Sequence, residues 1–169
     1  MILRALELLA GELARLHARA ELFVAGGAAL VLLYGAREAT KDVDALTASP
    51  QDRPLVFEAA AKVAADLGLP PDWLNDGAKG YVHGLAPGEV VLETPSLVVR
   101  ALAPNQLLAM KLSAWRDDVD IDDARLLLGK LAGDKASVWR RVEAHLVPGR
   151  ELKAQYAFED LWEAEHGHP

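Results

Sequence analysis

Hydrophobic and polar positions change their spacing sharply along the first part of the chain. In the first twenty residues apolar side chains recur every three or four positions, which predicts an amphipathic helix. Residues 22–25 then form an apolar run of strand length, which Gly26 and Gly27 end abruptly. Residues 28–34 are apolar and compatible with a helix, and residues 41–46 alternate in a way that predicts a second strand.

The rest of the chain predicts one more helix, a few strands and then helices alone. Apolar positions repeat every four residues in 55–67, and 89–93 and 96–102 have the pattern of strands. The other expected elements are a loop at 72–77 with Trp73 anchored in the core, a short strand at 81–83, and helices beginning at Pro104, within the acidic run 117–123, at Gly133 and at Leu152. This order predicts an α/β (α+β) fold, a mixed sheet with flanking helices and a C-terminal helical bundle. We expect a core at residues 1–103 and a helical region at 104–169 packed on it as one compact unit.

Composition limits the classes of protein to which the chain can belong. With 169 residues and 51% apolar composition, one domain with a buried core is expected. The absence of cysteine excludes a disulfide scaffold, a zinc–thiolate site and a thiol nucleophile. No apolar run reaches about 18 residues, so we expect a soluble cytoplasmic protein with no membrane partner. The net charge of −7 argues against extensive DNA binding and does not favour RNA, although a local basic patch is compatible with it.

The strand–turn–helix–strand segment carries the main candidate chemistry. Asp42 and Asp44 lie two residues apart on a predicted strand, so their carboxylates share a face and suit a divalent cation such as Mg²⁺. Gly26 and Gly27 open a helix, where backbone N–H groups favour phosphate. Each feature alone also fits a tight turn or a solvated strand edge. Arg37 and Thr40, in the connecting loop, shift the interpretation towards a site for metal-dependent phosphoryl or nucleotidyl transfer.

Two further groups of charges are candidates for the same site. Glu93, in the strand 89–93, would add a third carboxylate if its strand lay beside that of the aspartates, although exposed strand-edge charge is the better explanation of this residue taken alone. Lys111 falls on the apolar face of the helix that begins at Pro104, so it must snorkel or be paired with a carboxylate or a phosphate. We expect it to face the Asp42–Asp44 pair or a triphosphate. Asp120, at the edge of a buried stripe, is placed to reach Lys111 or Arg116.

These residues, in this order, resemble one group of nucleotidyltransferase-fold proteins, the toxins of the AbiEii and MenT type. The elements that carry the resemblance are Gly26-Gly27-x-Ala-Leu, Gly35-x-Arg37-x-x-Thr40-x-Asp42-x-Asp44, Lys111-Leu-x-Ala-x-Arg116 and Asp120-x-x-Asp123. The resemblance covers roughly residues 20–130. It implies transfer of a nucleoside monophosphate from an NTP, with Mg²⁺, to an acceptor such as the tRNA 3′ end, and a cognate antitoxin as partner.

The resemblance also implies a role for each matching position. The implied metal ligands are Asp42 and Asp44, with Glu93 as the candidate third; the implied phosphate-binding residues are Gly26, Gly27, Arg37, Thr40 and Arg116; and the implied catalytic residues are Asp42, Asp44, Lys111 and Asp120. Thr40 occupies the place of a hydroxyl that is phosphorylated as an off-switch in some relatives. The glycine pair departs from the Gly-Ser of many nucleotidyltransferases.

The mechanism that follows is two-metal nucleotidyl transfer, with the two aspartates bridging the cations. Lys111 and Arg37 would take up the charge that develops on the leaving pyrophosphate. Two alternatives remain open at this point. One is a non-catalytic interaction or regulatory protein with the same fold, and the other is a nucleotidyltransferase that modifies a small molecule such as an antibiotic.

Overall fold

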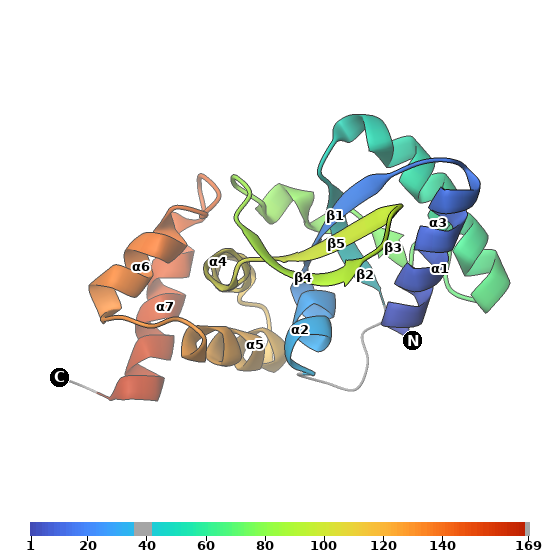
Figure 1. The fold of residues 1–169 in the computed structure, drawn as a ribbon. Coiled ribbons are helices and arrows are strands. Elements are labelled where there is room, and N and C mark those ends of the chain that lie inside the picture. Colours follow the sequence, from blue (N-terminus) through green and yellow to red (C-terminus); the bar gives the residue numbers. More distant parts are fainter. Residues whose placement is uncertain (36–41, 168–169) are drawn as a thin grey trace. The chain divides into compact units, whose positions relative to one another are not determined.

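The computed structural model describes residues 1–35 and 42–167, and the chain divides into two compact units. The first unit consists of Met1–Ala78 and Pro87–Leu102, and the second of Lys79–Ala86 and Ala103–Pro169. The boundary after Leu102 lies one residue from the one expected. The segment Lys79–Ala86 was expected in the first unit but belongs to the second, so the chain passes from one unit to the other three times (Figure 1).

The first unit is built on a mixed five-stranded sheet with the strand order β3-β2-β1-β5-β4. Strand β1 is parallel to β5 and antiparallel to β2, β2 is parallel to β3, and β4 is antiparallel to β5. The bounds are α1 Ile2–Arg15, β1 Ala20–Ala25, α2 Gly26–Tyr34, β2 Val43–Thr47, α3 Arg53–Leu67, β3 Leu74–Asn75, β4 Pro87–Glu93 and β5 Leu97–Leu102, with a 3₁₀ turn at Pro50–Asp52. The prediction of a mixed α/β (α+β) architecture is confirmed.

One face of the sheet forms the core of the first unit. Leu22, Val24 and Val99 point to this face and are almost completely buried, as is Val43 on β2. Helices α1 and α3 pack against each other, and Figure 1 shows them side by side. The buried residues of α1, such as Leu6 and Leu9, lie on its apolar stripe. The apolar residues that recur with the helical period of 3.6 and those that recur with the strand period of 2 therefore belong to one hydrophobic core.

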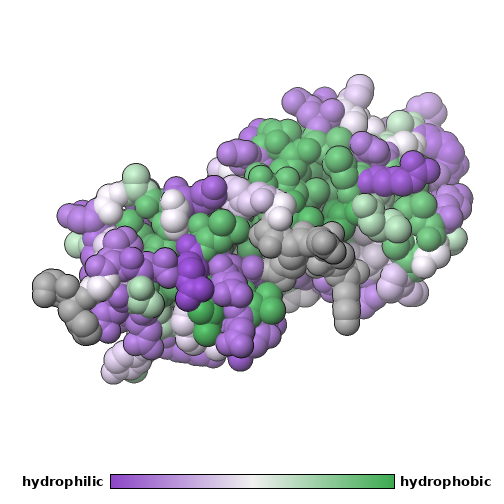
Figure 2. Space-filling model, turned by 90° about the horizontal axis from the view of Figure 1, so that it is seen from below, coloured by the Kyte–Doolittle hydropathy of each residue, from purple (hydrophilic) through white to green (hydrophobic). Residues whose placement is uncertain are grey.

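Helix α2 lies on the other face of the sheet. It begins at Gly26, beside the carboxylate of Asp44, and Tyr34 at its end is near enough to Glu89 of β4 to be affected by its charge. Every residue of α2 is apolar or glycine except for the hydroxyl of Tyr34, yet residues 31–34 are only half-buried. Figure 2 shows that hydrophobic surface gathers on the side of the molecule seen from below, where α2 lies in Figure 1.

The second unit is a bundle of helices around α4. Its helices are α4 Pro104–Ala114, α5 Asp118–Gly129, α6 Lys135–Glu143 and α7 Glu151–His166. Residues 106–114 of α4 are all buried, which explains why this helix shows no amphipathic pattern. Asp117 and Asp134 cap α5 and α6 by accepting hydrogen bonds from backbone N–H groups of the first turn. Each cap fixes the start of its helix.

Three local expectations have clear outcomes. Trp73 is buried as predicted, and its indole N–H donates to the carbonyl of Ala60 at 2.9 Å. The predicted loop at 72–77 contains strand β3, and the predicted strand at 81–83 is wrong, because the chain forms a 3₁₀ turn at Gly77–Tyr81 there. In the described ranges, no helix combines the length and the apolar character needed to cross a membrane.

Candidate functional site

Strand β2 presents the two aspartates on the face of the sheet that α2 shares. Val43 and Ala45 are buried on the core face, whereas Asp44 is half-buried and Asp42, just before the strand, is exposed. Asp44 is paired with Ala25, the residue that immediately precedes α2. The alternation read from the sequence therefore places both carboxylates where the strand β1 turns into a helix.

Gly26 is required at this turn for two independent reasons. Its φ of +64° lies in the left-handed region, which residues other than glycine rarely adopt. A Cβ atom built on Gly26 would also lie 3.2 Å from Oδ2 of Asp44, closer than ordinary contact. Ala25, the residue before the helix, offers no side-chain cap. The glycine therefore allows the carboxylate of Asp44 to sit directly against the N-terminus of α2, where negative charge is favoured.

Asn75 is a member of this site that the sequence did not indicate. It is paired with Asp44 on the neighbouring parallel strand β3, and its Nδ2 lies 3.4 Å from Oδ2 of Asp42. Its Oδ1 accepts a hydrogen bond from the backbone N–H of Gly77 at 2.9 Å. A Cβ atom on Gly77 would lie 3.8 Å from Oδ1 of Asp44. Two carboxylates and one amide are thus gathered at the end of the sheet, with Gly26 and Gly77 on either side.

Glu93 is not part of this group. Strand β4 lies at the edge of the sheet beyond β1 and β5, and not beside β2. Glu93 is also in register with Val98 and, through it, with Glu21, whereas Asp44 is in register with Ala25. From strand geometry the two are separated by roughly 13 Å along the strands and roughly 14 Å across them. The expectation that Glu93 supplies a third metal ligand is therefore wrong.

Two of the expected phosphate-binding residues, Arg37 and Thr40, lie outside the described residues. Gly27 is the second residue of α2, so the helix begins two residues before Ala28, where the sequence placed its start.

Lys111 forms a buried charge network within the second unit. Its Nζ lies 3.0 Å from Oδ1 of Asp120 and 2.8 Å from Oδ2 of Asp123, and both aspartates are almost completely buried. Pairing with Asp120 was one of the options expected from the sequence, and Asp123 is an additional partner. Since Lys111 is already paired with two buried carboxylates, we assign it a positioning role between α4 and α5.

Arg116 holds the other side of the same aspartate. Its Nε lies 3.0 Å from Oδ2 of Asp120, and its backbone N–H donates to the same oxygen at 2.9 Å. Burial alone would raise the pKa of Asp120, but the hydrogen bonds from Arg116 and Lys111 outweigh it and lower the pKa to about 2. The hydrogen bond to Asp120 in turn raises the pKa of Arg116. Asp120 is therefore ionised at all ordinary pH values and acts as the centre of the network.

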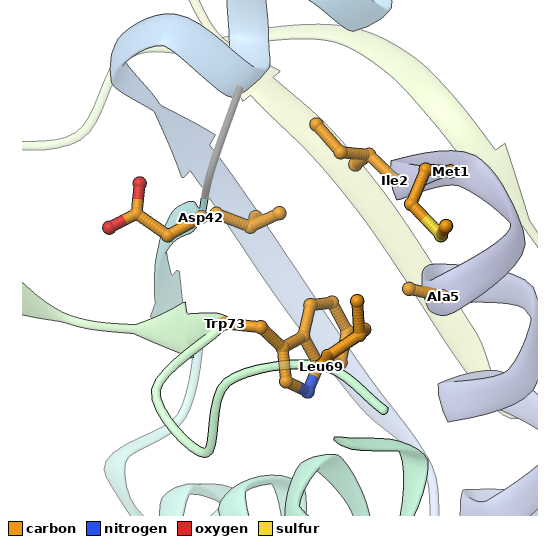
Figure 3. A pocket seen from close by; sticks show the side chains of 7 residues that line it. Met1, Ile2, Ala5, Asp42, Leu69 and Trp73 are labelled. Carbon is orange, nitrogen blue, oxygen red and sulfur yellow. The ribbon is translucent and has the colours of Figure 1, made fainter. Parts of the chain in front are cut away.

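A cavity of about 90 Å³ lies on the core side of β2. It is lined by Met1, Ile2, Ala5, Asp42, Val43, Leu69 and Trp73. Figure 3 shows that the carboxylate of Asp42 points away from Trp73 and from the residues of α1. The cavity wall is therefore apolar, and the charged site is outside it.

The chain matches no protein-family model, no curated protein and no solved structure. The chemistry of the site must therefore be judged from its own donors. In residues 1–35 and 42–167, no three His, Cys, Asp or Glu side chains come together as a metal site. Asp42 and Asp44 nevertheless offer carboxylate oxygens of the kind that Mg²⁺ prefers, and Asn75 donates to Asp42 through its Nδ2. The residues present fit a divalent cation that is held by two carboxylates and completed by neutral oxygens.

Proposed function

We propose that this protein transfers a nucleoside monophosphate from an NTP to an acceptor hydroxyl, with Mg²⁺ held at Asp42 and Asp44. The observation that supports the proposal is the position of both carboxylates and of Asn75 beside the start of α2 at Gly26. The proposed acceptor is the 3′ end of tRNA, the proposed setting is the cytoplasm, and the proposed role is that of a toxin restrained by an antitoxin protein.

In the proposed reaction, the acceptor oxygen forms a bond to the α-phosphorus, the bond between the α-phosphorus and pyrophosphate breaks, and the hydroxyl proton passes to solvent water. A bound Mg²⁺ supplies charge stabilisation for the attacking oxygen and for the pyrophosphate. The backbone N–H groups at Gly26 and Gly27 are placed to bind phosphate. Because the carboxylate of Asp44 already lies against Gly26, it repels a phosphate there. Triphosphate binding is therefore expected to require the divalent cation.

The test is label transfer from each α-labelled NTP to total tRNA in the presence of Mg²⁺. We expect Asp42→Asn and Asp44→Asn to abolish transfer while the protein keeps its far-UV circular dichroism spectrum. Asp66→Asn is the control, because Asp66 is exposed on the surface of α3 and pairs there with Lys62. Full transfer by Asp42→Asn would refute the assignment.

A non-catalytic interaction protein with the same fold is the second candidate. It is favoured by one observation, the lack of a third carboxylate beside Asp42 and Asp44 among the described residues. Equilibrium dialysis with NTP, with and without Mg²⁺, separates the two candidates. Metal-dependent NTP binding supports the enzyme, whereas no NTP binding under either condition supports the interaction protein. NTP binding without label on tRNA would point to another acceptor, such as a small molecule.

A further inference from the structure

Cationic side chains gather where α4 ends, inside the second unit. Nη1 of Arg150 donates to the carbonyl of Ser113 at 3.4 Å, and Nζ of Lys153 donates to the carbonyl of Ala114 at 2.9 Å. Arg116 follows in the chain, and its side chain is 69% exposed. The last carbonyls of a helix carry partial negative charge, which draws cations to this point.

Aromatic residues occupy the same place. The guanidinium of Arg150 lies over the ring of Tyr81, 4.7 Å from its centre. Trp115 ends α4 with a φ of +37°, a left-handed conformation that is unusual for so large a side chain, and it is only half-buried. Tyr156 is 65% exposed and lies about one turn from Lys153 on α7. We define the α4-end patch as Tyr81, Trp115, Arg116, Arg150, Lys153 and Tyr156.

The positive charge of this patch is only partly balanced. Arg116 shares Asp120 with Lys111, and the exposed Asp117 and Asp118 are its neighbours in the chain. Arg150 and Lys153, in contrast, donate to the carbonyl oxygens that end α4, while the exposed Glu151 between them in the chain accepts from the N–H of Gly149. The strongest attraction for an anion is therefore expected at Arg150 and Lys153, with Arg116 at the acidic margin.

We propose that the α4-end patch binds single-stranded nucleic acid, with phosphates at Arg150, Lys153 and Arg116 and bases stacked on Tyr156 and Trp115. Single strands are bound in this way, by cations that follow the backbone and by rings on which bases stack. An acidic polypeptide would match the cations but would leave the rings without a stacking partner. The proposal rests on contacts within the second unit, and it holds whether or not the protein transfers nucleotides.

The test is fluorescence anisotropy with labelled eight-nucleotide oligo-U and oligo-dU, without NTP, over a range of salt concentrations. With three phosphate contacts, the logarithm of the affinity should fall with the logarithm of salt concentration with a slope of about −2. Lys153→Gln should reduce the steepness of this slope by about 0.7 and weaken binding about tenfold at low salt. Lys153→Arg should retain both properties. Binding of either oligonucleotide supports the proposal. A difference between their affinities shows that the 2′-hydroxyl of the sugar contributes to binding.

Two variants separate charge from stacking. Tyr156→Ala should weaken binding about fivefold or more without changing the salt slope, because it removes a stacking surface and no charge. Lys135→Gln is the matched control, since Lys135 is a cation of the same unit that pairs with Glu159 outside the patch. Thermal unfolding of each variant verifies that it is folded. The proposal is overturned if Lys153→Gln and Lys135→Gln bind equally well, or if a polyglutamate peptide displaces the oligonucleotide as effectively as unlabelled oligonucleotide does.

Discussion

Single residues in the candidate site are constrained by the space around Asp44. Gly26 illustrates this, because its conformation and its closeness to a carboxylate both exclude a side chain. A glycine that is needed only for its backbone conformation tolerates substitution better than one that is also in contact with a functional group. The two effects can be separated within the first unit, because Gly35 has a similar φ of +59° and no atom of the described residues lies within 4 Å of a Cβ built on it.

We therefore expect Gly26→Ala to cost more stability than Gly35→Ala. The left-handed conformation costs each variant about 1 kcal/mol. Gly26→Ala should lose more than this and should also weaken Mg²⁺ binding, because the new methyl group displaces the carboxylate of Asp44. Urea unfolding measures the free energy of unfolding, and isothermal titration calorimetry measures metal binding. Equal losses of stability in the two variants would contradict the contact with Asp44.

The pKa of Asp120 makes a second prediction at this scale. The folded pKa of about 2 lies below the value of about 3.9 for an unfolded aspartate. The ionised carboxylate therefore stabilises the fold fully above about pH 4, and this contribution, about 2 kcal/mol, is lost as the pH falls through 2. Urea unfolding between pH 2 and 5 should show the loss.

Asp120→Asn provides the control for this pH dependence. It should reduce the free energy of unfolding at pH 7 by about 3 kcal/mol, because it breaks a buried ion pair. It should also flatten the pH dependence between 2 and 4. If the free energy of unfolding of Asp120→Asn depends on pH as steeply as that of the natural protein, another carboxylate is responsible for the pH dependence.

At the scale of elements, the acidic start of α5 has several separate roles. Asp117 caps the helix by accepting a hydrogen bond from the N–H of Asp120 at 3.0 Å. Asp120 and Asp123 point inward to Lys111, whereas Asp118 is exposed in the first turn. One run of like charges therefore contains a cap, a buried ion-pair network and a surface residue.

Asp117→Ala should thus destabilise the protein by about 1 kcal/mol, the usual cost of removing an N-cap. Asp118→Ala should cost only a few tenths of a kcal/mol, since it loses no more than an interaction with the helix dipole. Chemical denaturation of both variants makes the comparison. A loss for Asp118→Ala as large as that for Asp117→Ala would show that charge, and not capping, determines where the helix begins.

At the scale of the whole molecule, Gln106 is one of the residues that hold the segment Lys79–Ala86 in the second unit, together with Arg150 on Tyr81 and His145 at the carbonyl of His83. The fully buried side chain of Gln106 accepts a hydrogen bond from the N–H of Ala86 at 2.7 Å and donates to the carbonyl of Gly84 at 2.9 Å. The same segment connects β3 to β4 of the first unit. A side chain of the second unit therefore forms hydrogen bonds with the segment that connects two strands of the first unit.

Gln106→Leu should release this connection. Each buried polar group that loses its partner costs about 1–3 kcal/mol, and hydrogen exchange at Ala86 should become faster. Asn105→Ala is a suitable control, because Asn105 is the preceding residue but donates to the carbonyl of Arg141 instead. Unchanged exchange at Ala86 in Gln106→Leu would show that the segment is held by other contacts.

The sequence predicted those features that have a period or a local signal. The alternation around Val43 correctly placed Asp42 and Asp44 on one face. Lys111 was expected mainly to face that aspartate pair or a triphosphate, and its pairing with Asp120 was the alternative that the structure shows. Strand β3 was missed, because two residues are too few to show a period, and Asn75 was missed with it.

The order of the strands in the sheet could not be predicted from the sequence, for a different reason. A pattern along the chain does not say which strands pair, so Glu93 was considered as a ligand although two strands separate β4 from β2. The same limit applies to the segment Lys79–Ala86, which is held in the second unit by residues distant in sequence, such as Gln106.

The route of the chain through the segment Lys79–Ala86 also determines how this protein can be cut or recombined. A fragment that ends at Leu102 keeps this segment but loses Gln106, so the carbonyl of Gly84 is deprived of its donor. A fragment that begins at Ala103 keeps the glutamine but loses the backbone that it holds. Neither half is a module that can be exchanged by a single crossover in the gene. A shortened version of the first unit needs a new linker between β3 and β4, and recombination with other proteins is expected to preserve residues 79–106 as one block.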